Sequence, residues 1–258
     1  MKKLGVFLEI FSGVGGVSRA LRRRGLDTLS IDVLKHASDD MLVVANQRRI
    51  LRMIRTNRVS GVWLGTPCTS LTRARHGTPG SGWPEPLRSS ELPDGLPNLS
   101  DKDSQKVIEG NKLLEFSARV IKLCIRMKIP VAVENPCTSF LWWTTPFAQL
   151  YKSHPPHQRN FDFCSYRKPW RKRTRLWSWH IDMERVGKIC SSKCGICDFT
   201  GKPHCILKGT LNGHFLSKIA EPYPAGMCAQ VAHSFVETFE DQILYGLWRA
   251  GSGSSKMF

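Results

Sequence analysis

Two short segments carry side chains that could perform covalent chemistry, and each follows an apolar run typical of a buried strand. Cys68 lies in "GTPCTS", directly after "VSGVWL", and Glu134 ends the apolar part of "IPVAVEN". A thiolate adds to electron-poor carbons, and a carboxyl group that is partly desolvated has a raised pKa and can carry a proton. Cys68 is therefore a candidate nucleophile and Glu134 a candidate acid. The alternatives are a cysteine that serves as a small buried apolar residue and a glutamate in a surface salt bridge.

A glycine-rich turn precedes both segments. The apolar run "LGVFLEI" leads into "FSGVGG", a helical pattern follows, and Asp32 ends the next apolar run, "LDTLSIDV". Glycines let the backbone approach a ligand closely. The separation of Asp32 from Glu9 along the chain is near the spacing at which a carboxylate reaches a ribose hydroxyl. A nicotinamide enzyme is one alternative, although Ser18 stands where the dinucleotide fingerprint requires glycine. A purely structural turn is the other.

Alternating strand and helix patterns must bring these residues together. Short apolar runs alternate with amphipathic patterns through the first half of the chain, which predicts an α/β fold with a mostly parallel sheet and helices on both faces. Ser100 is the expected N-cap of the longest helix, with Asp103 three residues later. The polar segment from Thr72 to Ser100 is expected to be a functional loop, a lid or disordered. Ligands of such sheets bind beyond the carboxyl ends of the strands, where the candidate residues lie.

The chain of 258 residues has a net charge of +17, which indicates a polyanionic partner. Basic and aromatic residues are interleaved between Lys152 and Arg175, a combination that suits phosphates and bases together. We expect the partner to be nucleic acid, with an acidic membrane surface as the second candidate by charge alone. We do not expect the protein to associate with a membrane. A basic protein without such a partner is the alternative. The nine cysteines, in a chain without a recognisable secretory signal, favour a reducing compartment. We therefore expect the protein to be intracellular, nuclear or cytoplasmic, and not secreted. We also expect it to be a monomer.

The segment "CSSKCGICDFTGKPHC" is a candidate metal site. Its thiols and imidazole suit a tetrahedral zinc ion in a piece of chain too small to fold by itself. The expected ligands are Cys190, Cys194, Cys197 and His204, with Cys205 as a further donor in the motif and Cys164 as a possible replacement for one ligand. Unligated cysteines in a loop and a redox pair are the alternatives.

Four motifs in order, "LEIFSGVGG", "GTPC", "VENP" and "RKRTRLW", resemble those of the cytosine-5 methyltransferases that use S-adenosylmethionine. The resemblance covers roughly residues 4–179 and implies a Rossmann-like methyltransferase sheet. It makes Cys68 the nucleophile, Glu134 the acid, and Arg173 and Arg175 the pair that steadies the nucleophile loop and the target base. It also implies a set of cofactor-binding residues, namely Glu9, Phe11, Ser12, Gly13, Gly15, Gly16, Asp32, Asp40 and Pro67.

The same resemblance implies the substrate and the division of the chain. Methyl transfer to cytosine in nucleic acid is expected, with DNA favoured over RNA and with a duplex base flipped out of its stack. We expect a catalytic cofactor-binding domain over residues 1–165, a short target-recognition region over 166–220, a C-terminal helix over 221–250 that packs on the catalytic domain, and a flexible tail over 251–258. Two alternatives are a catalytically silent nucleic-acid-binding module of the same fold and a C5 transferase that acts on a free pyrimidine nucleotide.

Overall fold

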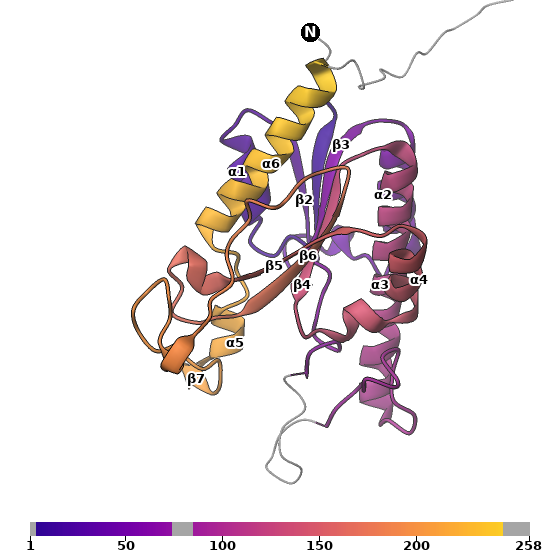
Figure 1. Ribbon diagram of the computed structural model, residues 1–258. Helices are drawn as coiled ribbons and strands as arrows, with labels where there is room; N and C mark the ends of the chain where they lie inside the picture. Colours follow the sequence, from indigo (N-terminus) through magenta and orange to yellow (C-terminus); the bar gives the residue numbers. More distant parts are fainter. Residues whose placement is uncertain (1–3, 74–84, 245–258) are drawn as a thin grey trace, which may run out of the picture.

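The computed structural model describes residues 4–73 and 85–244 (Figure 1). Strands and helices alternate over the first half of the chain, as the apolar patterns predict. The elements of this half are β1 (Val6–Ile10), α1 (Gly16–Arg22), β2 (Thr28–Ile31), η1 (Ala37–Asp39), α2 (Val44–Arg55), β3 (Val59–Leu64), α3 (Asp101–Met127) and β4 (Val131–Pro136).

The second half begins with shorter elements and ends in a long helix. The elements are η3 (Phe140–Trp143), α4 (Thr145–Ser153), β5 (His157–Asp162), η4 (Phe163–Tyr166), β6 (Arg173–Trp179), η5 (Lys193–Gly195), β7 (Thr210–Leu211), β8 (His214–Phe215), α5 (Leu216–Ile219) and α6 (Ala225–Leu244).

Six strands form one sheet in the order β2-β1-β3-β4-β6-β5. β1 to β4 are mutually parallel, which confirms the α/β class and the mostly parallel sheet. β6 runs antiparallel between β4 and β5. The expected domain boundary at residues 165–166 falls between β5 and β6, which are neighbours in this sheet. The sheet therefore continues beyond that boundary to Trp179.

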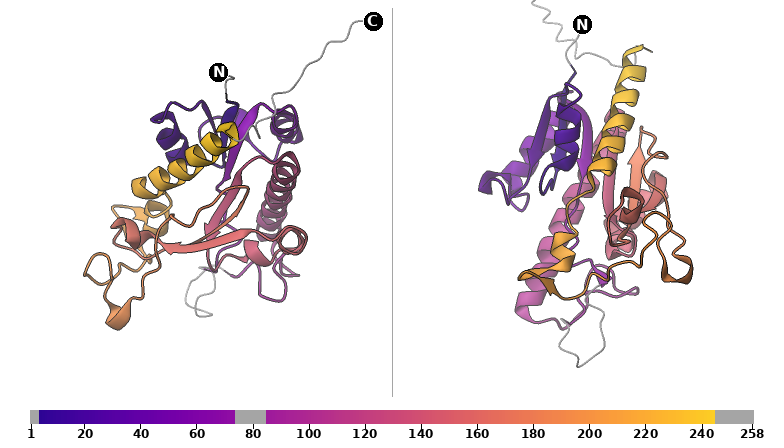
Figure 2. Two further views of the ribbon diagram at one scale, coloured as in Figure 1. Left: turned by 45° about the horizontal axis from the view of Figure 1, so that its top comes forward. Right: turned by 90° about the vertical axis from the view of Figure 1, so that its left-hand side faces the viewer.

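Helices cover both faces of the sheet (Figures 1 and 2). α1 and α6 pack together on one face, whereas α2, α3 and α4 pack on the other. Phe235 of α6 meets Phe7 of β1 edge to face, with ring centroids 4.7 Å apart. Gly61 in β3 allows this fit, because a Cβ atom there would lie 3.0 Å from the rings of Phe235 and Phe239. Among the described helices, none combines the length and the apolar character that a membrane span requires.

The long helix α3 begins as the sequence predicts. The Ser100 side chain accepts a hydrogen bond of 3.3 Å from the backbone N–H of Asp103. Part of the predicted loop before it, residues 74–84, lies outside the described residues, as does the predicted tail at residues 251–258. Residues 85–100 contact α3 through the fully buried Arg88, so the disordered alternative does not hold for this part, and the functional loop and the lid stay predictions.

Candidate active site at the carboxyl ends of the parallel strands

The order of the strands places a topological switch point between β1 and β3, where a ligand crevice is expected. The chain passes from β1 to β2 on one side and then places β3 on the other side of β1, so the direction of the connections reverses there. Ligands of open α/β sheets bind outside the carboxyl ends of the strands at such a point. The glycine turn follows β1, and Pro67 and Cys68 follow β3. Glu134, near the end of β4, lies on the strand next to β3.

Hydrogen bonds on both sides fix the segment that carries Cys68. The backbone N–H of Gly65 donates to the carbonyl of Ile10, and Asn135 donates its side-chain N–H to the carbonyl of Thr66 at 2.6 Å. The hydroxyls of Thr66 and Ser117 are 3.0 Å apart. This segment is therefore tied to β1, to the end of β4 and to α3. Cys68 itself is partly exposed, as a nucleophile must be.

Arg88 holds the residues that follow Cys68. Its Nε donates to the carbonyl of Ser70 and its Nη2 to the Ser70 hydroxyl, each at 3.0 Å. Nη1 donates to the carbonyl of Pro93 and to Oδ1 of Asn111 on α3. Burial lowers the pKa of Arg88 to about 10, and the charge of Asp94 opposes this shift. A buried cation thus supports the turn after Cys68.

Glu134 is a buried carboxyl group with one oxygen free. Its side chain is on the α6 side of the sheet, and Oε2 accepts a hydrogen bond of 2.8 Å from the hydroxyl of Tyr223. Oε1 is buried and has no hydrogen-bond partner among the described residues. Burial raises the pKa of Glu134, while the charge of Lys172 and the bond from Tyr223 lower it. A raised pKa favours the protonated carboxyl, whose free oxygen can donate a hydrogen bond.

The charges of Glu134 and Cys68 act on each other. Burial is the largest cause that raises the pKa of Cys68, and the negative charge of Glu134 is the next. The positive charge of Lys172 lowers the pKa of both groups. Protonation of Glu134 removes the repulsion that opposes the Cys68 thiolate. Protonation of Glu134 thus makes the Cys68 thiolate easier to form, although burial still raises the pKa of this thiol.

The glycine turn leaves open space at one position. Gly13 has φ of +49°, and a Cβ atom at this residue would have nothing within 4 Å. Phe11 also has a positive φ, of 57°, and the neighbouring Ser12 is buried. Gly15 and Gly16 have no such space, because Lys35 and Cys228, respectively, lie within 3 Å of their would-be Cβ atoms. The open backbone at Gly13 is thus the place in this turn where a ligand could approach.

Glu9 supports the turn from beneath. It is fully buried, and its two oxygens accept hydrogen bonds from the backbone N–H groups of Val17 and Ser18 in the first turn of α1. Burial raises the pKa of Glu9, and the bonds from Ser18 and Val17 lower it. Each oxygen of the Glu9 carboxylate is thus bonded to the helix end in the described chain, and its contact with a cofactor stays a prediction.

Asp32 joins the turn to the end of β2. Its oxygens accept the backbone N–H groups of Gly13 at 2.7 Å and Leu34 at 2.9 Å. The carboxylate is partly exposed and each oxygen keeps a second lone pair for a hydroxyl donor. Lys35, which follows, donates to the hydroxyls of Ser12 and Ser30. Asp40 is engaged locally, since its Oδ1 accepts the N–H of Leu42 at 2.8 Å.

The predicted arginine pair has other partners. Arg173 donates to both oxygens of the buried Asp162, at 3.0 and 2.8 Å, and to the carbonyl of Cys190. Arg175 donates to Oδ1 of Asn160 and to the sulfur of Cys137. The expectation that both arginines steady the Cys68 loop is therefore not met in the described chain, where Lys172 is the cation whose charge acts on Cys68 and Glu134.

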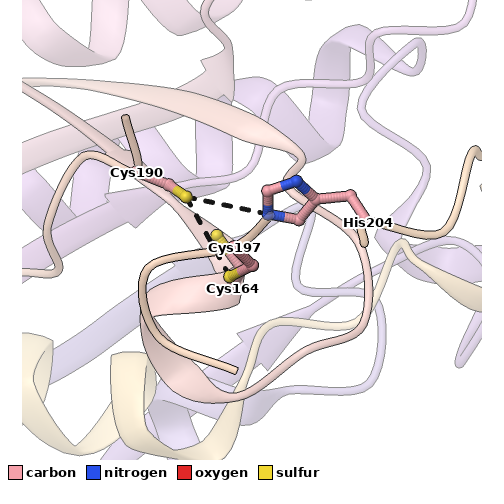
Figure 3. A group of neighbouring side chains, drawn as sticks. All are labelled: Cys164, Cys190, Cys197 and His204. Atoms are coloured by element: carbon pink, nitrogen blue, oxygen red, sulfur yellow. Dashed lines mark hydrogen bonds between the residues drawn. The ribbon is translucent and has the colours of Figure 1, made fainter. Parts of the chain in front are cut away.

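A second cluster lies beyond β5. The potential ligand atoms of Cys164, Cys190, Cys197 and His204 all lie within 4.8 Å of one another, and Figure 3 shows the side chains pointing together. These residues could hold a metal ion. The prediction for Cys194 is wrong, because this residue adopts a left-handed conformation with φ of 52° and its side chain is exposed. Cys164 of η4 takes its place.

Three residues of the candidate active site escape sequence reasoning. Tyr223 and Lys172 contact or influence Glu134 and Cys68, yet neither follows a predicted strand of the parallel sheet. Lys35 comes shortly after the second predicted strand, but nothing in the sequence marks it as a donor to Ser12. Lys172 lies within the motif "RKRTRLW", directly before Arg173, and this position is the sequence signal that could have indicated it. A comparison with protein-family models finds no matching family, and a comparison with curated proteins finds no match.

Proposed function

We propose that this protein transfers a methyl group from S-adenosylmethionine to C5 of cytosine in nucleic acid, with DNA favoured over RNA. The observation that carries the proposal is the pairing of Cys68 with Glu134 on neighbouring parallel strands, where the buried Oε1 of Glu134 has no partner among the described residues. A buried polar atom without a partner costs free energy unless a ligand supplies one. The ring nitrogen of a cytosine is a partner of the required kind.

The residues around the β1–β3 crevice fit a nucleoside cofactor. The open backbone at Gly13 gives room for its approach, and Asp32 has lone pairs for ribose hydroxyls. Exposed apolar side chains in the loops after β1 and β2, those of Val14, Val33 and Leu34, suit an adenine face. These features support a Rossmann-like methyltransferase sheet with the cofactor in this crevice. S-adenosylmethionine supplies a methyl group on a positively charged sulfur, which is the electrophile that the reaction needs.

The two side chains would divide the chemistry of the base between them. C5 of cytosine is a weak nucleophile, so the Cys68 thiolate first forms a bond to C6 while Glu134 donates its proton to N3. The C5–C6 π electrons would then be available at C5 for the new bond to the methyl carbon, while the bond between that carbon and the sulfonium sulfur would break and leave a neutral thioether. A base removes the hydrogen from C5, the electron pair restores the C5–C6 double bond, and the Cys68–C6 bond breaks. Glu134 regains its proton from N3, and Cys68 leaves as the thiolate.

The charge of the chain supports a polymeric substrate. A net charge of +17 is more than a single nucleotide requires, whereas it suits a phosphate backbone. A base within a duplex has to leave its stack to meet Cys68. The proposal also includes zinc as a structural ion in the Cys164 cluster, to which we assign no step in the methyl transfer.

The test is methyl transfer from S-adenosylmethionine with a labelled methyl group. Separate incubations with duplex DNA, RNA and free cytidine nucleotides should label the DNA most strongly. Cys68→Ala should abolish labelling, whereas Cys205→Ala, which removes an exposed cysteine outside the ligand cluster, should leave it unchanged. Label in the free nucleotide alone would support the nucleotide transferase instead. Absence of label in all three pools, with DNA binding retained, would indicate a catalytically silent binding module.

A further inference from the structure

The cluster of cysteines beyond β5 has no apolar core to stabilise it. Cys164, Cys190 and Cys197 form a small buried group of their own, separate from the two larger cores, with Phe199 packed against it. Three thiols and one ring bury too little apolar surface to order a segment that runs from residue 190 to residue 205. Small irregular pieces of this kind usually depend on a disulfide or a metal ion.

The distances within the cluster match a metal ion better than a disulfide. The sulfurs of Cys190 and Cys197 are 4.0 Å apart, and the Cys190 sulfur is 3.8 Å from Nε2 of His204. Zinc bonds of about 2.3 Å to sulfur and about 2.0 Å to nitrogen, at tetrahedral angles, separate two sulfurs by about 3.8 Å and a sulfur from a nitrogen by about 3.5 Å. A disulfide would need sulfurs about 2.05 Å apart.

The surrounding residues orient the ligands. The Ser192 hydroxyl lies 3.3 Å from Nδ1 of His204, which leaves Nε2 directed at the cysteines. Metal-bound histidines commonly have such a partner on the second ring nitrogen. The backbone also forms a tight turn between two ligands, where the N–H of Cys197 donates to the carbonyl of Lys202 and the N–H of Gly201 donates to the carbonyl of Cys197.

We propose that Cys164, Cys190, Cys197 and His204 bind one structural zinc ion that clamps the segment from residue 190 to residue 205 onto the end of β5. Three thiolates and one imidazole are the donor set of a closed structural zinc site. Cys164 is the second residue of η4, just after the end of β5, whereas the other three ligands come from the irregular segment. The ion would therefore join two parts of the chain whose shared apolar cluster is small.

The proposed zinc site is also linked to Arg173. Asp162, two residues before Cys164, accepts hydrogen bonds from the guanidinium of Arg173 and from the backbone N–H of Cys190, each at 2.8 Å. Arg173 in turn donates to the carbonyl of Cys190. Two of the zinc ligands thus flank the only carboxylate that Arg173 contacts among the described residues. Loss of the ion would loosen the position of Arg173 as well as the segment itself.

The experiment measures metal in the full chain, purified without chelators, by elemental mass spectrometry. We expect about one zinc ion per chain, and about one in Cys194→Ala, because Cys194 lies outside the cluster. Cys164→Ala should lose most of the zinc. Since this variant could fail to fold, Co²⁺ is also titrated into metal-free parent protein, where thiolate-to-cobalt charge transfer and the absorption of tetrahedral Co²⁺ should appear together.

Three results would overturn the proposal. The first is a folded parent protein that contains no zinc and shows no cobalt bands. The second is loss of zinc in Cys194→Ala with retention in Cys164→Ala, which would mean that the four ligands all come from the segment between residues 190 and 205. The third is a parent in which Cys190 and Cys197 form a disulfide. None of these readouts depends on methyl transfer, so they test the metal site separately from the proposed reaction.

Discussion

The buried ion pair between Asp162 and Arg173 offers a sharp test of how β5, β6 and the cysteine cluster are joined. Asp162 is fully buried and accepts three hydrogen bonds, two from the guanidinium of Arg173 and one from the N–H of Cys190. Asp162→Asn keeps the shape of the side chain but removes its charge. It also turns an NH₂ group toward at least one of these donors, so a buried donor loses its acceptor.

The expected loss of stability follows from these contacts. Breaking a fully buried ion pair costs about 3–5 kcal/mol, because an uncompensated charge remains. The Arg173 side chain is 35% exposed, so water can solvate part of that charge. We therefore expect Asp162→Asn to lower the free energy of unfolding by about 2–4 kcal/mol. In a chain of this size that corresponds to a decrease in Tm of roughly 5–15 °C.

Urea unfolding followed by tryptophan fluorescence measures this loss, with all proteins in the same zinc-containing buffer. Glu237→Gln is the matched control. It removes the acid of an exposed pair, Arg185–Glu237, whose side chains are 67% and 42% exposed. This change should cost less than about 1 kcal/mol. An Asp162→Asn protein that folds and lies within about 0.5 kcal/mol of the parent would refute the reasoning, because a buried pair with these contacts cannot be that weak.

Two further perturbations test the candidate active site and the packing around Phe161. Glu134→Gln removes a negative charge that raises the pKa of Cys68. In alkaline buffer, iodoacetamide should therefore modify Cys68 several-fold faster in this variant than in the parent, as measured by mass spectrometry of the peptide. An unchanged or slower rate would contradict the coupling between the two groups. Because the pKa of Glu134 is raised in the folded protein, the stability of the parent relative to this variant should be greatest at low pH and should fall as the pH rises through that raised pKa. Gly187→Ala places a Cβ atom 2.7 Å from Phe161 at a φ of +61°, and should cost about 2–4 kcal/mol by urea unfolding, whereas Gly25→Ala, at φ of +80° in open space, should cost about 1–2 kcal/mol. Equal losses for the two alanines would show that the contact with Phe161 is not close.

The parallel half of the fold could be predicted because local patterns determine it. Each of its strands is a short apolar run followed by a polar residue, and parallel strands place those residues at one edge. Cys68 and Glu134 could be paired in this way without knowledge of any contact. The N-cap at Ser100 is likewise a local signal, since its partner, Asp103, is three residues away.

The antiparallel part could not be predicted in the same way. β5 is an edge strand whose sequence, "HQRNFD", begins with exposed polar residues, so it has no apolar run to mark it. β6 pairs with β4 across a long stretch of chain, which local patterns do not reveal. The position of β6 in the sheet determines the partners of Arg173 and Arg175, and the motif alone did not indicate Asp162 or Asn160.

The spacing of cysteines predicted a metal site but not all of its ligands. A Cys-x-x-Cys pair suggests that both of its members bind one ion. Here the backbone turns outward at Cys194, and the fold brings Cys164 from the end of β5 instead. Similarly, Glu9 occupies the position of a ligand-binding residue in the motif, yet the buried end of α1 takes both of its oxygens.

The most direct test of the central claim is covalent capture of Cys68 by a duplex oligonucleotide that contains 5-fluorocytosine. After thiolate addition and methyl transfer, the fluorine at C5 cannot leave as a proton does, so the elimination that frees the enzyme is blocked. We predict an adduct that requires S-adenosylmethionine, that mass spectrometry maps to Cys68, and that Cys68→Ala cannot form. A folded, DNA-binding protein that gives no adduct, or gives one at a different cysteine, would contradict the account.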